Sequence, residues 1–266
     1  MSSPLPWPDF TALTSPMDKL VALSRFYGTD PSFVIAGGGN TSVKNGNRLQ
    51  VKGSGTSLAD IAPEGFVEMD RDALDTILNS ALSDDIDERE AQFKEAGLAA
   101  RIHPELGQRP SVECVLHHLM PGTYVVHTHS TVVNMITCVQ GGEALTKKLF
   151  GDRVLWLPYV TPGYVLSKGL ADAMEAYTRE TGKAEPEAVF MGNHGLIISG
   201  ETPEEIRSKT DAILDVIIKH LGTPSPTPFG EITLLKDEHR RELIHRIAPT
   251  LRALFSDGDN LKVIPF

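Results

Sequence analysis

Apolar residues recur three and four positions apart over several stretches of the chain, which is the period of an amphipathic helix. One such stretch begins at Ser15-Pro16 and ends near Gly28, and another follows Asp70, whose side chain predicts a helix N-cap. The clearest opens at Thr202-Pro203-Glu204-Glu205, a capping box with proline at the first helical position. Further helices are predicted over 111–119, 132–137, 167–181 and 236–256.

Short apolar, β-branched runs lie between these helices and predict strands. They cover 33–36, 41–44, 49–52, 66–69, 124–129, 154–157, 188–191 and 196–198. Asn45-Gly46-Asn47 separates two of them and predicts a β-hairpin. Strands that alternate with helices indicate an α/β fold, and the hairpin makes the central sheet mixed or antiparallel rather than doubly wound.

The chain is predicted to form one domain over residues 1–266, in which 223–266 are a Pro-rich linker and a helical tail. Residues 83–110 are polar, charged and irregular, so we expect a mobile excursion or a lid there.

Composition excludes several classes of partner. The chain has 266 residues and a formal net charge of −10, which argues against nucleic acid because phosphate backbones require a basic face. It has no apolar run long enough to span a membrane, and its first ten residues lack the features of a signal peptide. The two cysteines, Cys114 and Cys138, cannot form a disulfide framework, so a cytoplasmic location is expected.

Two histidines end the apolar run Tyr124-Val125-Val126 with one residue between them. Side chains alternate between the faces of a strand, so His127 and His129 are expected to point the same way. Two imidazoles on one face are a common means of binding a divalent metal. The alternative is a pair of surface histidines at a strand end.

His194 lies between two predicted strands, with Gly192 and Asn193 before it and Gly195 after it. Three neutral imidazoles with a fourth position open to water or substrate form a typical catalytic zinc site. His194 is therefore the candidate third ligand, although a single loop histidine is usually a solvated side chain. The remaining histidines are interpreted mostly as surface or packing residues.

Glu113 lies near the start of a helix that Ser111 is predicted to cap, with Val112 on its buried face. Desolvation there would raise the pKa of Glu113 toward the range useful for proton transfer. The alternative role is to complement the helix dipole. His117, one turn later, is close enough along the helix to contact Glu113.

Two glycine-rich loops, Gly37–Ser42 and Gly53–Ser57, follow or connect predicted strands. Glycines let the backbone approach a ligand, and exposed N–H groups with Ser and Thr hydroxyls can bind an anion. Lys52 adds a positive charge beside the second loop. Neither loop has the spacing of a P-loop or a dinucleotide fingerprint, and each alone would be an ordinary turn.

Together these motifs resemble the class II aldolase/adducin family over roughly residues 30–215. The matching motifs, in order, are Gly38-Gly39-Asn40-Thr41-Ser42, Gly53-Ser54-Gly55-Thr56, Ser111-x-Glu113, His127-x-His129 and Asn193-His194-Gly195. Segments 51–56, 110–129 and 151–163 are most similar to the aldolase half of the bifunctional rhamnulose-phosphate aldolase/dehydrogenase proteins.

The resemblance implies a three-layer α/β/α sandwich and a divalent metal, usually Zn²⁺, on His127, His129 and His194. It implies that Glu113 ligates the resting metal and then acts as general acid/base. It also implies a homo-oligomer, typically a tetramer, and a phosphate site. The residues implied to bind phosphate are Asn40, Thr41, Ser54, Gly55 and Ser111.

Two features depart from the family pattern. Val112 stands where fuculose-phosphate-type aldolases have a second serine, and the dehydrogenase domain of the bifunctional proteins has no counterpart here. The expected function is metal-dependent retro-aldol cleavage of a sugar phosphate, similar to a ketose 1-phosphate, or of a related hydroxy-keto compound. The alternatives are an epimerase or decarboxylase of the same family and a non-catalytic, adducin-like interaction module.

Overall fold

The structure, a computed structural model, describes residues 5–222, 236–254, 256–257 and 260–261. It contains two compact units, Met1–Thr223 and Pro224–Phe266. The second unit holds helix α9 (Asp237–Leu254) and a hairpin of β8 (Ser256–Asp257) and β9 (Asn260–Leu261). The predicted Pro-rich linker lies outside the described residues. Among the described helices, none combines the length and apolar character that crossing a membrane requires.

A seven-stranded sheet forms the centre of the first unit, in the order β3-β2-β1-β4-β7-β6-β5. Only β5 and β6 are parallel neighbours; all other pairs are antiparallel, so the predicted mixed sheet is confirmed. The strands are β1 (Asn40–Asn45), β2 (Arg48–Lys52), β3 (Phe66–Asp70), β4 (Tyr124–Thr128), β5 (Val154–Leu157), β6 (Ala188–Met191) and β7 (Gly195–Gly200).

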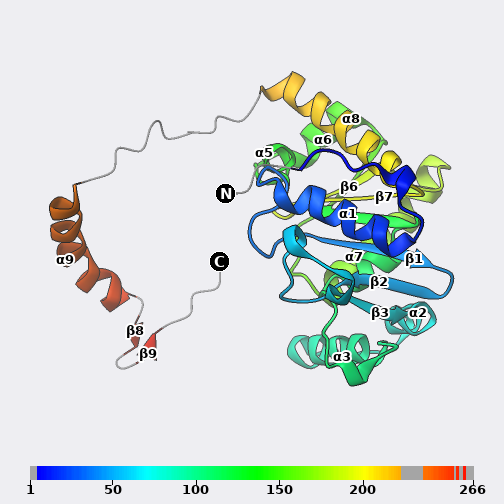
Figure 1. Ribbon diagram of the computed structural model, residues 1–266, viewed down its shortest axis with the longest axis horizontal. Coiled ribbons are helices and arrows are strands. Elements are labelled where there is room, and N and C mark those ends of the chain that lie inside the picture. The colour runs from blue at the N-terminus through cyan, green and yellow to red at the C-terminus, as the bar shows by residue number, and fades with distance from the viewer. Residues whose placement is uncertain (1–4, 223–235, 255, 258–259, 262–266) are drawn as a thin grey trace. The chain divides into compact units, whose positions relative to one another are not determined.

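Helices cover both faces of this sheet, which gives the three-layer α/β/α sandwich (Figure 1). One layer consists of α1 (Pro16–Thr29), α5 (Thr131–Thr137), α6 (Gly142–Phe150) and α8 (Pro203–Leu221). The other consists of α2 (Arg71–Asn79), α3 (Ile86–Ala99), α4 (Cys114–Leu119) and α7 (Tyr164–Thr181). Alternate residues of the central strands supply the two cores, as the period of a strand requires.

Local chemistry explains where the predicted elements begin. Ser15 and Thr202 accept hydrogen bonds from the backbone N–H three residues on, and Asp70 caps α2 in the same way. In the β1–β2 hairpin Asn45 pairs with Arg48, and Gly46 has a positive φ of 57°. The turn chemistry of the sequence therefore selects the hairpin that begins the sheet.

The predicted strand at 33–36 is wrong. The segment is an irregular loop in which Ala36 has a φ of +54° and Ile35 is 74% exposed. Val34 is buried and Phe33 packs edge-on against Tyr27, so the apolar run contributes to the core without forming a strand. The carbonyl of Phe33 instead accepts a hydrogen bond from the N–H of His129 at 3.0 Å.

Two further predictions around α3 and α4 are corrected. Residues 83–110 contain the 14-residue helix α3, which the pattern missed because only Phe93 and Gly97 of the helix are buried. Helix α4 begins at Cys114 rather than next to Ser111, and Val112 is 62% exposed instead of lying on a buried face.

Candidate metal and acid–base site

Three imidazoles from separate parts of the chain meet at one edge of the sheet. His127 is in β4, His129 lies just past its end, and His194 is in the turn between β6 and β7. One ligand nitrogen of each lies within 4.8 Å of the others. The structure thus brings together the three histidines named from the sequence, in a group able to hold a metal ion.

Strand pairing produces this convergence. Because β4 and β7 are antiparallel neighbours, the end of β4 lies beside the start of β7, which His194 precedes. Gly195 permits this close approach, since a Cβ there would lie 2.4 Å from the carbonyl oxygen of Thr128. Asn193 takes a left-handed conformation, with a φ of 50°, and so turns the chain back toward the sheet.

Burial favours the neutral form of His127 and His129, which is the form that binds metals. His127 Nδ1 lies 2.9 Å from the carbonyl oxygen of Leu196, so Nδ1 carries the proton and Nε2 presents its lone pair toward His129 Nε2, 3.0 Å away. Burial lowers the pKa of His127 to about 4, the main effect on it, and also lowers the pKa of His129. A second-sphere carbonyl that fixes the tautomer is typical of metal-binding histidines.

Glu113 completes the group from the residue before α4. Its Oε1 lies 3.2 Å from His194 Nε2, and its Oε2 lies 3.6 Å from His127 Nε2. Burial acts to raise the pKa of Glu113, but the nearby His127 and His194 and the hydrogen bond from Asn40 outweigh it and lower the pKa to about 2. Glu113 is therefore a carboxylate at neutral pH, contrary to the raised pKa expected from the sequence.

The donor set fits a divalent cation. Oε1 of Glu113 is buried and has no hydrogen-bond partner among the residues that the structure describes. A buried carboxylate oxygen without a partner is costly unless a cation or proton compensates it. Three imidazole nitrogens face the same point, and imidazole with carboxylate is a ligand set that suits zinc.

Asn40 links Glu113 to a buried polar network. Its Nδ2 donates to Glu113 Oε2 at 2.6 Å and to Ser111 Oγ at 3.1 Å. Its Oδ1 accepts from His117 Nε2, and His117 Nδ1 accepts from Ser42 Oγ at 2.7 Å. His117 is fully buried, and burial lowers its pKa to about 3. This role of His117 was not predicted from the sequence, where the only signal for it is the pair of polar residues Asn40 and Ser42 on one face of a buried strand.

A cleft of about 270 Å³ opens beside the histidines. Lys52 lies at its wall, where its Nζ donates to the carbonyl of Gly37 at 3.0 Å and burial lowers its pKa. Val112 also lines the cleft and brings no hydroxyl to it. The residues named from the sequence that line this cleft are Asn40, Lys52, Ser54, Gly55, Ser111, Glu113, His129 and His194.

Thr41 is not among them, which corrects the set implied by the family resemblance. Because side chains alternate along β1, Thr41 points to the opposite face of the sheet from Asn40. Its hydroxyl lies 2.6 Å from Ser24 Oγ of α1, and the residue is fully buried. Its side chain packs the helix against the sheet and does not reach the cleft.

Comparisons with known proteins agree with this architecture. A curated relative, an uncharacterized oxidoreductase named YuxG from Bacillus subtilis (strain 168), is 28% identical over 254 residues, or 91% of this chain. The match covers 35% of that protein, so the chain spans about a third of the relative's length.

Two solved structures show the same fold. The N-terminal class II aldolase domain of a conserved protein from Thermoplasma acidophilum is 28% identical with a TM-score of 0.65, covering 78% of this chain and 94% of that one. An L-fuculose 1-phosphate aldolase is 16% identical with a TM-score of 0.51, covering 88% and 98%. The family model of the class II aldolase and adducin N-terminal domain matches residues 18–216. The chain therefore belongs to the class II aldolase and adducin family.

Proposed function

We propose that this chain is a divalent-metal-dependent aldolase that cleaves a sugar phosphate similar to a ketose 1-phosphate, or a related hydroxy-keto compound. The observation that carries the proposal is a group of three neighbouring imidazoles beside a buried carboxylate oxygen that has no hydrogen-bond partner among the described residues. Sugar-phosphate aldolases share this fold, as the L-fuculose 1-phosphate aldolase does.

His127, His129 and His194 would hold the metal, for which we propose zinc. When bound, such an ion would supply Lewis-acid stabilisation for negative charge on the carbonyl and adjacent hydroxyl oxygens of a substrate. Leu196 fixes the tautomer of His127, and the Phe33 carbonyl fixes the backbone of His129. These contacts orient the donors before any ligand binds.

Glu113 would carry the proton that the reaction moves. In the condensation direction its carboxylate takes a proton from the carbon next to the substrate carbonyl, and in cleavage it returns the proton to that carbon. The carboxylate is ionised at neutral pH, and its Oε1 is free of hydrogen bonds to described residues. Asn40 holds the other oxygen, so the carboxylate presents one fixed atom to the substrate.

The cleft residues would bind an anionic group close to the reacting carbons of the substrate. Ser54, Gly55 and Ser111 supply hydroxyl and backbone groups, and Lys52 supplies positive charge. Asn40 completes this set through its contact with Ser111.

Chelation and borohydride reduction test the mechanism. Lys52 is the lysine of the cleft, and burial lowers its pKa, which is the setting in which a lysine can form a Schiff base. A metal-dependent enzyme should lose activity in EDTA, regain it with Zn²⁺, and keep it after borohydride treatment in the presence of substrate. The assay is a retro-aldol screen across phosphorylated and free ketoses. Full activity after thorough chelation would overturn the proposal.

Val112 favours a second candidate, an epimerase or decarboxylase that uses the same enediolate chemistry. Its apolar side chain removes one hydroxyl from the anion site, which weakens the case for a phosphate. Product analysis on pentulose phosphates and on hydroxy-keto acids distinguishes the two. A non-catalytic, adducin-like interaction module is disfavoured because the three histidines and Glu113 are all retained.

We also propose a subfamily, an oligomeric state and a cellular location for the enzyme. We propose kinship with the aldolase half of bifunctional rhamnulose-phosphate aldolase/dehydrogenase proteins, which the longer relative with an oxidoreductase name supports. A homo-oligomer, as a tetramer, and a cytoplasmic location are also proposed. Both cysteines are free thiols, which suits a reducing compartment.

A further inference from the structure

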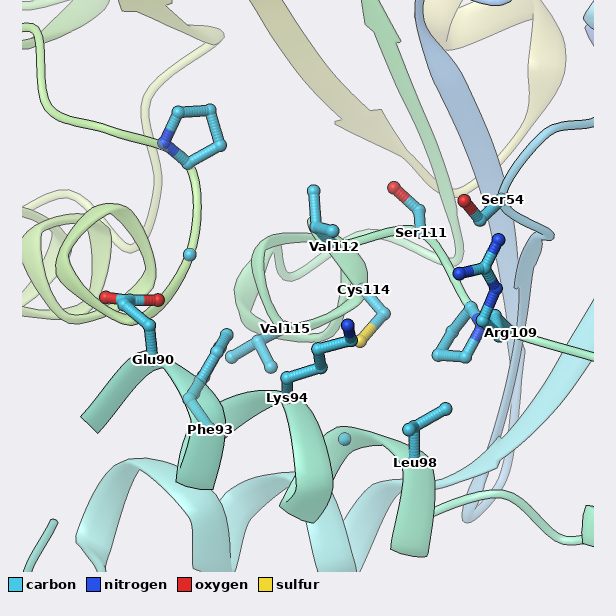
Figure 2. A pocket seen from close by; sticks show the side chains of 14 residues that line it. Ser54, Glu90, Phe93, Lys94, Leu98, Arg109, Ser111, Val112, Cys114 and Val115 are labelled. Atoms are coloured by element: carbon cyan, nitrogen blue, oxygen red, sulfur yellow. The ribbon is translucent and has the colours of Figure 1, made fainter. Parts of the chain in front are cut away.

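A second cavity, of about 300 Å³, lies beside the metal-side cleft, which is the cleft of about 270 Å³ next to the histidines. Figure 2 shows the side chains that line this second cavity. Ser54, Ser111, Val112 and Pro162 line both spaces, so the two are adjacent and share these residues as a common wall. The shared wall is close to the proposed chemistry, because Ser111 Oγ lies 3.1 Å from the Asn40 amide that also binds Glu113. A molecule held at the histidines therefore lies next to the second cavity.

The walls of this cavity are mostly apolar. Phe93 of α3 and Val115 of α4 are buried side chains that face it, and Leu98 extends the surface (Figure 2). Pro110 also lines the cavity. Together the two spaces reach the size of sites that enclose a small molecule, usually 300–1,000 Å³. Such walls favour hydrocarbon over the hydroxyl groups of a short sugar.

Gly97 keeps the cavity open. It lies inside helix α3, where glycine costs roughly 1 kcal/mol relative to alanine. The backbone does not require glycine there, because Gly97 is not among the residues with positive φ, and a Cβ at this position would meet nothing within 4 Å. The missing side chain leaves room in the cavity that a larger residue would occupy.

Two positively charged side chains lie at the polar part of the cavity. Lys94 of α3 and Arg109, whose carbonyl accepts from Ser54 N at 2.8 Å, form no ion pair with any residue in the described part of the chain. The carboxylate of Glu90 also lines the cavity and accepts a hydrogen bond from Tyr164 N at 3.0 Å. With two cations against this one carboxylate, the net charge of the cavity lining is positive.

We propose that this cavity binds the distal part of the substrate, an apolar segment of several carbons that ends in an anionic group. The inference rests on the proposed function, because the reacting end of the same molecule occupies the metal-side cleft. It narrows the substrate class from a short sugar phosphate to a hydroxy-keto compound with an apolar extension. Val112, exposed between the two spaces, then contacts the start of that extension.

Hydroxamates of increasing length test the proposal on the full-length protein loaded with Zn²⁺. A hydroxamate offers two adjacent oxygens to a metal, so acetohydroxamate reports the metal site alone. Hexanohydroxamate adds four methylenes, and we expect affinity to rise about threefold to fourfold for each one that is buried. Isothermal titration measures the ratio of the two dissociation constants.

Gly97→Leu fills the cavity, and we expect it to abolish the gain in affinity with length. Ala91→Leu is the matched control, because it adds the same side chain at an exposed position of the same helix that lines neither space. The control should keep the wild-type ratio. Equal ratios for acetohydroxamate and hexanohydroxamate in the wild type, or an undiminished ratio in Gly97→Leu, would overturn the proposal.

A second probe separates this proposal from the proposed function. Hexanoate, which lacks the chelating group, should shift the amide signals of Phe93, Gly97 and Val115 in the ¹H–¹⁵N spectrum of the metal-free protein. Lys94→Met should weaken this effect several-fold because it removes one cation. If acetohydroxamate fails to bind but hexanoate shifts these signals, the proposed metal-site function is wrong and the proposed binding in the second cavity is supported. If hexanoate shifts none of these signals, the proposal for the second cavity is wrong.

Discussion

The amide nitrogen of Asn40 lies 2.6 Å from Oε2 of Glu113, and these two residues are 73 positions apart in the chain. The contact leaves Oε1 as the oxygen available to a ligand and joins the carboxylate to the buried network of His117 and Ser42. Four polar side chains thus form a connected group beneath the histidines. Such a network orients a reactive group only if each member keeps its partner.

Asn40→Ala should therefore destabilise the protein and raise the pKa of Glu113. It removes the donor to Oε2 and the acceptor for His117 Nε2, and each buried group left unpaired costs about 1–3 kcal/mol. Urea unfolding of the metal-free protein measures the loss. Asn47→Ala is the control, since Asn47 makes an exposed hydrogen bond to Asp70 at 3.3 Å and should change stability by less than about 0.5 kcal/mol. Similar losses in both variants would contradict the network.

Because His117 is buried, the stability of the protein should depend on pH. Its pKa falls from 6.5 to about 3 on folding because of burial, so between these values the unfolded chain binds a proton that the folded protein does not. Stability should fall as pH decreases below 6.5, by about 1.4 kcal/mol per pH unit for one proton, with no contribution above 6.5. His117→Gln should make the slope between pH 4 and 6 shallower by about one proton.

Other histidines also contribute to the slope of stability against pH. The pKa of His127 is lowered in the same direction, so the slope in His117→Gln should be reduced but not abolished. His220→Gln, at an exposed position, provides the comparison and should keep the wild-type slope. An unchanged slope in His117→Gln would show that His117 is protonated in the folded protein.

Substitution of Thr41 should affect stability, and substitution of a cleft residue should affect anion binding, because Thr41 points to the face of β1 opposite the cleft. Thr41→Val removes the hydrogen bond to Ser24 and should cost about 1 kcal/mol of stability without changing anion binding. Ser54→Ala should do the opposite and weaken the binding of inorganic phosphate while stability changes little. Calorimetric titration of the Zn²⁺-loaded variants and their unfolding curves give both quantities. Weaker phosphate binding in Thr41→Val would show that Thr41 is one of the residues that bind phosphate.

Much of the fold was predictable because its signals are local. The caps at Ser15, Asp70 and Thr202 and the turn at Gly46 depend on a few adjacent residues, and the structure contains each of them. The pairing of His127 with His129 follows from strand alternation in the same way. His194 could be named from its glycine neighbours, since the close approach at Gly195 leaves no room for a side chain.

The features that the sequence did not predict depend on contacts between residues that are distant along the chain. The bond from Asn40 to His117 spans 77 positions, so no local pattern separates this imidazole from an ordinary packing residue. The family resemblance assigned Thr41 to the phosphate site, whereas alternation along β1 turns its side chain toward α1. Helix α3 buries too few residues to show an apolar stripe, and the second cavity forms between residues of α3, of α4 and of loops distant in the sequence.

The central claim is that His127, His129 and His194 hold one divalent metal ion. Elemental analysis after loading with Zn²⁺ and dialysis should give about one ion per chain in the wild type. The ion should be lost in His194→Ala and kept in His103→Ala, which changes an exposed histidine that contacts Glu68 and Glu105 instead. A wild type without metal, or equal metal in wild type and His194→Ala, would contradict the account.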